Sequence, residues 1–346
     1  MKKQLLALLL ALCMVLALTA CGGTTKPVTG EPDTPQTPTA EETAPAEEPL
    51  TWPTKGDINV LIPANTGGDT DTTFRTFSTE IGKTLGTNVM LTNMAGGAGA
   101  LATYELLDYE PDGYTGIWHH YDSILLTMKG ETEKRYDEYL DVAAVIPVTG
   151  GNYLITVNKD KGWTSLQDLV DYATENPGEL VWAVESGGWN HVFSASVVKA
   201  LGVDINLVDF GSSSDRNAAL LGGNADILVA NYANLKSYPD DFMALASCSL
   251  ERQNVCPDIP TMKELGYGDI ESEKFYYFGF KAGTDERIVD AMGQAIKAAV
   301  DTDAGVEVMT KYTYTTWEVL IGQDALDYLH NFENKYQEFV ELAMAG

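Results

Sequence analysis

Short apolar runs alternate with longer amphipathic stretches along most of the chain. Eight of these runs are bounded by turn residues and predict strands at 58–62, 89–92, 115–118, 154–157, 180–184, 205–210, 227–230 and 242–246. Between them apolar residues recur at helical spacing, as in Phe74, Phe77 and Ile81, and a last amphipathic helix is predicted over 324–343. Strands that alternate with helices favour an α/β fold with parallel, covered sheets.

The first 20 residues have a different pattern, which predicts an export signal. Lys2 and Lys3 precede an unbroken apolar run over 5–18, which is too short to span a bilayer. Small residues then lead to Cys21, as in the lipobox of bacterial lipoproteins. We therefore expect a lipoprotein signal peptide over 1–20 and a lipid anchor on Cys21. The alternative is an ordinary cleaved signal in which Cys21 has no role.

Residues 21–50 are predicted to form an extended tether. Proline, threonine and acidic residues dominate this segment, and its few apolar side chains cannot offset the entropy of ordering it. Fully extended in a polyproline conformation, it reaches on the order of 90 Å. The folded part, 51–346, would then stand away from the lipid, and a chain of this size usually divides into two domains.

The strongly acidic composition of the chain limits the kinds of partner that it can bind. The chain carries 50 acidic and 22 basic residues and a net charge of −28, which argues against nucleic-acid binding. An anionic ligand would have to be held by local dipoles, because the overall field repels it. Cys248 and Cys256 lie eight residues apart in an exported chain, so they form either a disulfide or two free thiols.

Three glycine-rich turns, at 63–71, 93–99 and 185–191, each follow a predicted strand and lead into a helix. Glycine lets backbone amides approach a ligand, and a helix N-terminus offers unpaired N–H groups with about half a positive charge. Asn190 is expected to cap the third helix. One such turn is often a plain connection. Three of them at strand ends predict an anion-binding cleft between two lobes.

These turns and several other motifs resemble those of one receptor family. Gly67-Gly68-x-x-Asp71, Pro111-Asp112-Gly113-Tyr114-Thr115 and Pro257-Asp258-Ile259-Pro260-Thr261 occur in the expected order. The chain resembles the Bug-type substrate-binding receptors of tripartite tricarboxylate transporters over nearly all of 52–346. The resemblance implies a two-lobed type II periplasmic-binding-protein fold with a ligand cleft between the lobes. The first lobe would comprise 51–148 and 252–346, the second 149–251, with crossings near 147–154 and 247–257.

The resemblance also implies a function and a site. It implies a monomeric, extracytoplasmic receptor that gives a small carboxylate to a membrane permease, uses no cofactor and is not an enzyme. Backbone amides and hydroxyls, with few cationic side chains, would hold the ligand. The ligand-binding residues predicted are Thr66, Gly67, Gly68, Asp71, Gly97, Ala98, His119, Tyr121, Ser186, Gly187, Gly188, Trp189, His191 and Asn231. Asp71 is expected to fix its own loop rather than to touch an anion.

Aromatic residues depart from the family pattern. Trp118-His119-His120-Tyr121 follows a strand, and Trp189 lies in the third turn. These rings either line the pocket, which would favour a flat or aromatic carboxylate, or pack the lobe. Neighbouring imidazoles on a strand point to opposite faces, so His119 and His120 do not predict a metal site. Asp226 is either a further contact or a turn residue.

Enzyme motifs do not support a rival class. The chain lacks a Gly-x-Ser-x-Gly elbow, a His-Glu-x-x-His helix and a phosphate-binding loop ending in Gly-Lys-Ser/Thr. Binding without turnover is therefore favoured over a surface hydrolase. A receptor for an amino acid, metal chelate or heterocycle remains the alternative, because a fold does not fix its ligand.

Overall fold

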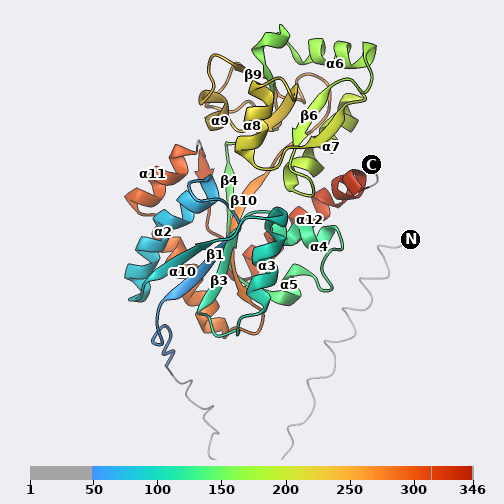
Figure 1. The fold of residues 1–346 in the computed structure, drawn as a ribbon. Coiled ribbons are helices and arrows are strands. Elements are labelled where there is room, and N and C mark those ends of the chain that lie inside the picture. The colour runs from blue at the N-terminus through green and yellow to red at the C-terminus, as the bar shows by residue number, and fades with distance from the viewer. Residues whose placement is uncertain (1–48, 313, 345–346) are drawn as a thin grey trace, which may run out of the picture. The chain divides into compact units, whose positions relative to one another are not determined.

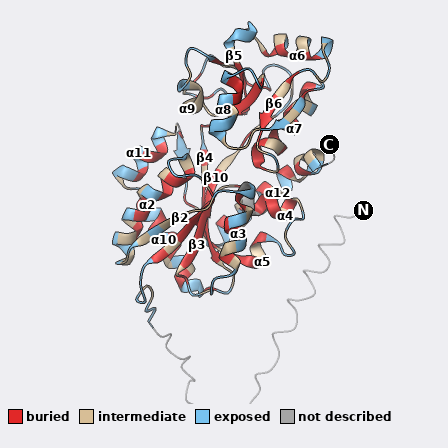
Figure 2. Ribbon diagram, viewed as in Figure 1, coloured by how far each residue is buried: buried red, intermediate tan, exposed pale blue. Residues whose placement is uncertain are grey.

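Two β-sheets organise the protein, whose computed structural model describes residues 49–312 and 314–344. The predicted signal peptide, Cys21 and nearly all of the tether lie outside these residues. The first sheet has the strand order β11-β4-β10-β3-β1-β2 and the second β7-β6-β8-β5-β9. Each sheet forms the centre of one lobe, and its central strands are buried beneath helices with exposed outer faces, whereas the edge strands β2 and β7 are partly exposed (Figures 1 and 2). The α/β, two-lobed fold predicted from the sequence is confirmed.

The elements have the following bounds. The strands are β1 (Ile58–Ile62), β2 (Val89–Asn93), β3 (Thr115–His119), β4 (Leu140–Thr149), β5 (Leu154–Asn158), β6 (Val181–Val184), β7 (Asn206–Asp209), β8 (Ile227–Ala230), β9 (Phe242–Ser247), β10 (Lys274–Lys281) and β11 (Thr316–Trp317). The helices are α2 (Asp69–Leu85), α3 (Ala100–Leu107), α4 (Asp122–Met128), α5 (Tyr136–Tyr139), α6 (Leu166–Glu175), α7 (Trp189–Leu201), α8 (Ser213–Leu221), α9 (Tyr232–Lys236), α10 (Glu286–Val300), α11 (Asp303–Lys311) and α12 (Gly322–Met344), with short 3-10 turns η1 (Gly97–Gly99) and η2 (Lys159–Lys161).

The prediction of purely parallel sheets is wrong for part of each sheet. β1 is parallel to β2 and β3, and β6 is parallel to β7 and β8. In contrast, β10 runs antiparallel to β3 and β4, and β5 runs antiparallel to β8 and β9. These antiparallel strands flank the two passages of the chain between the lobes, from β4 to β5 and from β9 to β10. They need no helical crossover within one sheet.

The sequence pattern missed three strands of the first sheet. All eight predicted strands are present, but β4, β10 and β11 were not predicted. β4 contains Pro147, which cannot donate to a ladder and therefore argues against a strand. The chain passes between the sheets after Thr149 and returns between Ser247 and Lys274. The lobe boundaries at 148/149 and 251/252 remain a prediction.

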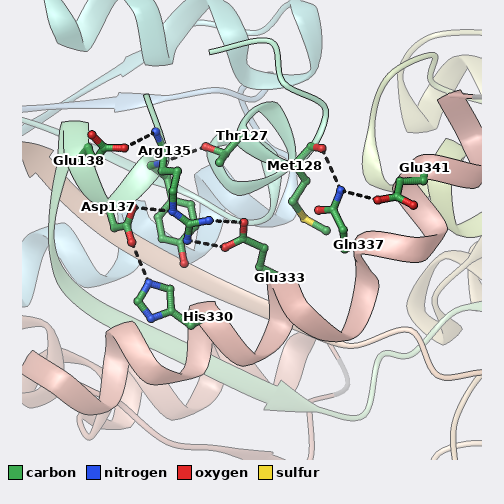
Figure 3. A network of polar contacts seen from close by, with 10 residues as sticks. Thr127, Met128, Arg135, Asp137, Glu138, His330, Glu333, Gln337 and Glu341 are labelled. Atoms are coloured by element: carbon green, nitrogen blue, oxygen red, sulfur yellow. Dashed lines mark hydrogen bonds and ion pairs between the residues drawn. The ribbon is translucent and has the colours of Figure 1, made fainter. Parts of the chain in front are cut away.

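The C-terminal helix α12 contacts both lobes. Arg135 donates to both carboxylate oxygens of Glu333 at 2.8 Å, and the Nε2 atom of His330 lies 2.8 Å from an Asp137 oxygen (Figure 3). On its other side α12 packs against α7 of the second lobe, where the ring centroids of Phe332 and Trp189 are 5.2 Å apart. None of the helices in the described residues is both long and apolar enough to cross a membrane.

Cys248 and Cys256 are both free and buried. Burial raises the pKa of the Cys256 thiol to about 11, and it raises that of Cys248 further. Since the thiolate is the reactive form, we expect neither residue to be alkylated within minutes by iodoacetamide at pH 8 in the native protein. Peptide mass spectrometry before and after denaturation measures this. Rapid native labelling, or a melting temperature that falls on reduction, would contradict the expectation.

Candidate functional site

Loops from the ends of strands in both sheets surround one cavity of about 760 Å³. From the first lobe come the turn between β1 and α2, the residues after β2 and the residues after β3. From the second lobe come the turns that lead into α7, α8 and α9. The wall consists of residues 63–70, 95, 96, 99, 119–121, 151, 153, 185, 188–190, 212–214, 216, 229–231, 233, 234, 237, 274, 311 and 312. The cavity thus has the position that the sequence predicted, at strand ends from both lobes.

The turn before α2 is closed by an internal carboxylate. Gly67 has a φ of +87°, and its amide donates to Asp71 Oδ2 at 2.9 Å. Asp71 is buried and also accepts from Asn93 and Arg75. Burial by itself raises the pKa of Asp71, but these hydrogen bonds outweigh it and hold the pKa below its usual value. These contacts agree with the prediction that Asp71 fixes its own loop.

Replacing Asp71 with alanine is expected to cost about 1–2 kcal/mol of unfolding free energy at pH 7, because the Gly67 amide and the partly buried Asn93 side chain lose a charged acceptor. The folded-state pKa of Asp71 is lowered, so its contribution is present above pH 4 and is lost as the pH falls through the folded pKa. Urea unfolding at pH 7 and at pH 3 measures both effects. An equal difference between wild type and variant at the two pH values would contradict this role.

The turn before α7 repeats the geometry of the first turn. Gly187 has a φ of +77°, and its amide donates to His191 Nδ1 at 3.3 Å, again four residues ahead. Gly188, like Gly68 in the first turn, is the N-cap in extended conformation. The prediction that Asn190 caps this helix is wrong. Its Oδ1 atom instead turns back and accepts from the Glu185 amide at 2.8 Å.

Eight of the fourteen predicted ligand-binding residues lie in the cavity wall: Thr66, Gly67, Gly68, His119, Tyr121, Gly188, Trp189 and Asn231. The other six do not: Asp71, Gly97, Ala98, Ser186, Gly187 and His191. Asp71 and His191 each accept the amide of their own turn. Gly97 and Ala98 belong to η1, and their neighbours Gly96 and Gly99 reach the wall instead.

The two remaining predicted contacts, Ser186 and Gly187, use backbone groups to bind other residues of the protein. The amide of Ser186 donates to Asp209 Oδ1 at 3.1 Å. The carbonyl of Gly187 accepts from Lys129 Nζ at 3.0 Å, which ties this turn to the first lobe. Asp226 precedes β8, outside the cavity wall, and accepts from the Val181 amide of β6 at 2.7 Å, so its observed contact is structural.

Two ion pairs in the wall were not anticipated from the sequence. Lys274 Nζ pairs with Asp69 Oδ2 in the first lobe, and Arg216 Nη1 lies 3.5 Å from Glu185 Oε2 in the second. Burial alone would raise the pKa of Asp69, but the Lys274 ammonium holds it well below its usual value. The family resemblance implied few cationic side chains at the ligand. Lys274 begins a strand that was not predicted, so no pattern linked it to the turn 205 residues earlier.

The aromatic residues mainly pack the protein core. Trp118 is fully buried between Phe74 and Tyr276, away from the wall. Trp189 and Tyr121 border the cavity, but only 3 % and 4 % of their surfaces are exposed, and their rings stack 5.1 Å apart. These contacts support the packing interpretation rather than a flat aromatic pocket.

The adjacent histidines show no metal-site geometry in the described residues. Their rings lie 4.4 Å apart, and no group of three or more His, Cys, Asp or Glu side chains there is arranged to hold a metal ion. Burial, followed by the nearby Lys274 charge, lowers the pKa of His120 to about 4. His120 is therefore neutral at pH 7.

Comparison with known proteins places the chain in a family. Protein BugT of Bordetella pertussis is 26 % identical over 264 residues, which cover 74 % of this chain and 80 % of BugT. A Cupriavidus necator protein named "UPF0065 protein in gbd 5'region" is 27 % identical over 258 residues, covering 74 % and 78 % of the two chains.

Solved structures have the same fold. MatC from Rhodopseudomonas palustris, solved with bound malate, has a TM-score of 0.68 at 23 % identity and covers 83 % of this chain and 99 % of its own. A second R. palustris protein, solved with adipate, has a TM-score of 0.73 at 21 % identity, covering 84 % and 98 %. The model of the tripartite tricarboxylate transporter family receptor matches residues 73–342. This chain therefore belongs to the tripartite tricarboxylate transporter receptor family.

Proposed function

We propose that this chain is an extracytoplasmic receptor that captures a small carboxylate between its lobes and delivers it to the membrane permease of a tripartite tricarboxylate transporter. Binding draws the lobes together by a hinge motion and involves neither turnover nor a cofactor. The receptor acts as a monomer. A lipid on Cys21 holds it at the membrane surface, and residues 21–50 let the folded part reach its permease.

The main support is the convergence of helix N-termini on one cavity. The N-cap residues of α2, α7 and α8, which are Gly68, Gly188 and Ser212, all lie in its wall. Helix N-termini favour anions, even in a protein with a net charge of −28. Two proteins of the same fold were solved with malate and adipate, which are dicarboxylates.

Thermal unfolding of the purified protein with panels of carboxylic acids, amino acids and aromatic acids tests the ligand class. We expect carboxylic acids to raise the melting temperature in a concentration-dependent manner. If amino acids raise it and carboxylic acids do not, the proposed substrate class is wrong. Chemical conversion of any of these compounds would replace the receptor by an enzyme.

Metabolic labelling with a clickable fatty acid tests the anchor. The wild-type chain should incorporate the label and partition with membranes, whereas Cys21→Ala should do neither. A labelled Cys21→Ala protein, or an unlabelled wild type, would reject the lipid on Cys21.

A further inference from the structure

On the first-lobe side of the cavity, the positive charge of Lys274 and the negative charge of Asp69 cancel each other. The ammonium of Lys274 contacts Asp69 and lies 5.2 Å and 5.5 Å from the ring centroids of Tyr276 and Tyr314. The Lys274 side chain is 15 % exposed and that of Asp69 29 %. Both charged groups therefore border the cavity in fixed positions, and together they contribute no net charge.

Carboxylates of the protein already occupy donors at the N-terminus of α2. Asp69 Oδ1 accepts from the Thr70 amide at 2.9 Å, and Asp71 Oδ2 accepts from the Gly67 amide at 2.9 Å. A ligand carboxylate at this end would compete for these amides and would meet the charge of Asp69. Neutral His120 adds no positive charge to this part of the wall.

The second-lobe side keeps more free donors for an anion, although it has one acid of its own, Glu185, whose carboxylate lies 3.5 Å from Arg216 Nη1. The first turn of α7 contains no acidic residue, and the amides of its first two residues, Trp189 and Asn190, come too early in the helix to find an acceptor within it. Both contacts of Arg216 with its neighbours, to Glu185 and to the Gly211 carbonyl, use Nη1. Within the described residues its Nε and Nη2 atoms have no hydrogen-bond partner, so the guanidinium can still bind a carboxylate through two donors.

We propose that the second-lobe wall binds the carboxylate of the ligand and that the Asp69–Lys274 pair binds a neutral amide or hydroxyl at its other end. This inference rests on the proposed function and narrows the ligand to a monocarboxylate with such a distal group. A primary amide matches the pair, because its oxygen accepts from Lys274 while its nitrogen donates to Asp69. A second carboxylate meets the charge of Asp69, and an ammonium meets that of Lys274. Lys311, the other cation of the wall, is exposed, and water screens its charge.

Matched ligands of equal length test the inference by calorimetry on the purified protein. The four-carbon set is succinate, its monoamide succinamate, 4-hydroxybutanoate and 4-aminobutanoate, and a six-carbon set is built in the same way from adipate. We expect the monoamide and the hydroxy acid to bind at least about tenfold more tightly than the dicarboxylate and the amino acid of the same length.

Charge-changing variants should redirect this preference. Asp69→Asn leaves Lys274 uncompensated and should favour the dicarboxylate, whereas Lys274→Gln leaves Asp69 and should favour the ammonium ligand, each by about tenfold over wild type. The double variant is neutral again and should prefer the amide. Arg216→Gln should weaken all four ligands. Circular dichroism checks that each variant folds.

The outcomes separate the two proposals. If wild type binds succinate or adipate more tightly than the matched monoamide, the inference is wrong while the carboxylate receptor stands. If none of the carboxylates binds, the proposed function itself fails. If one of the variants does not fold, the wild-type affinities for the matched ligands still test the inference.

Discussion

Replacing Gly68 with valine is expected to abolish ligand binding while the protein still folds. Gly68 lies in the cavity wall as the N-cap of α2, where the proposed ligand would approach the backbone. Its φ of −67° suits any L-residue, so the substitution is not excluded by the backbone. A Cβ atom there would lie 3.3 Å from the Asn65 carbonyl oxygen, and the valine side chain would take up space at the cavity wall. We expect an affinity loss of at least about a hundredfold, or roughly 2.7 kcal/mol.

Two variants serve as controls for this experiment. Gly188→Val is the matched change in the second lobe, where a Cβ would also lie 3.3 Å from a carbonyl oxygen, that of Glu185. It should lose affinity as well. Gly86→Ala lies at the other end of α2 with a φ of +69°, so it should lower stability by about 1–2 kcal/mol and leave affinity unchanged. Calorimetry with the ligand found by thermal unfolding measures each. Retained affinity in Gly68→Val would remove this turn from the binding site.

The sequence predicted the elements of the site better than its side-chain chemistry. Local pattern was sufficient for the turns around Gly67 and Gly187, because each depends on a glycine between a strand and a helix. It was also sufficient for the role of Asp71, whose bond to Gly67 spans four residues. Both statements concern segments in which neighbours in sequence are neighbours in space.

The two ion pairs of the cavity wall join residues that are far apart in the sequence, so local pattern could not predict them. The bond between Lys274 and Asp69 joins residues 205 positions apart, and that between Arg216 and Glu185 spans 31. Predicting the first of them requires the position of β10, a strand missed because its apolar residues are buried on both faces and do not alternate with polar ones. The mixture of parallel and antiparallel strands was also missed. It follows from how the chain passes between the lobes, which a local pattern does not contain.

Replacing Phe332 with alanine is expected to cause a large loss of stability. Phe332 is 2 % exposed on α12, and its ring lies 4.9 Å from that of Phe275 and 5.2 Å from that of Trp189. Phe275 belongs to the first sheet and Trp189 to the second lobe, so the Phe332 side chain packs between residues of both lobes. Removing a buried phenylalanine ring costs about 3–5 kcal/mol, and we expect this loss in the unfolding free energy.

The same substitution should also weaken ligand binding, because Phe332 supports two residues of the cavity wall. Its ring stacks 5.8 Å from Tyr121 and lies 5.2 Å from Trp189, which also packs against Tyr336 of α12. The space left by the missing ring in Phe332→Ala lets Tyr121 and Trp189 move. These two wall residues are then no longer held in their binding positions before the ligand arrives. Urea unfolding and calorimetry measure the two losses, with the exposed position Glu338→Ala on the same helix as the control expected to change stability by less than about 0.5 kcal/mol. Wild-type affinity in a destabilised Phe332→Ala protein would show that α12 supports the fold without shaping the site.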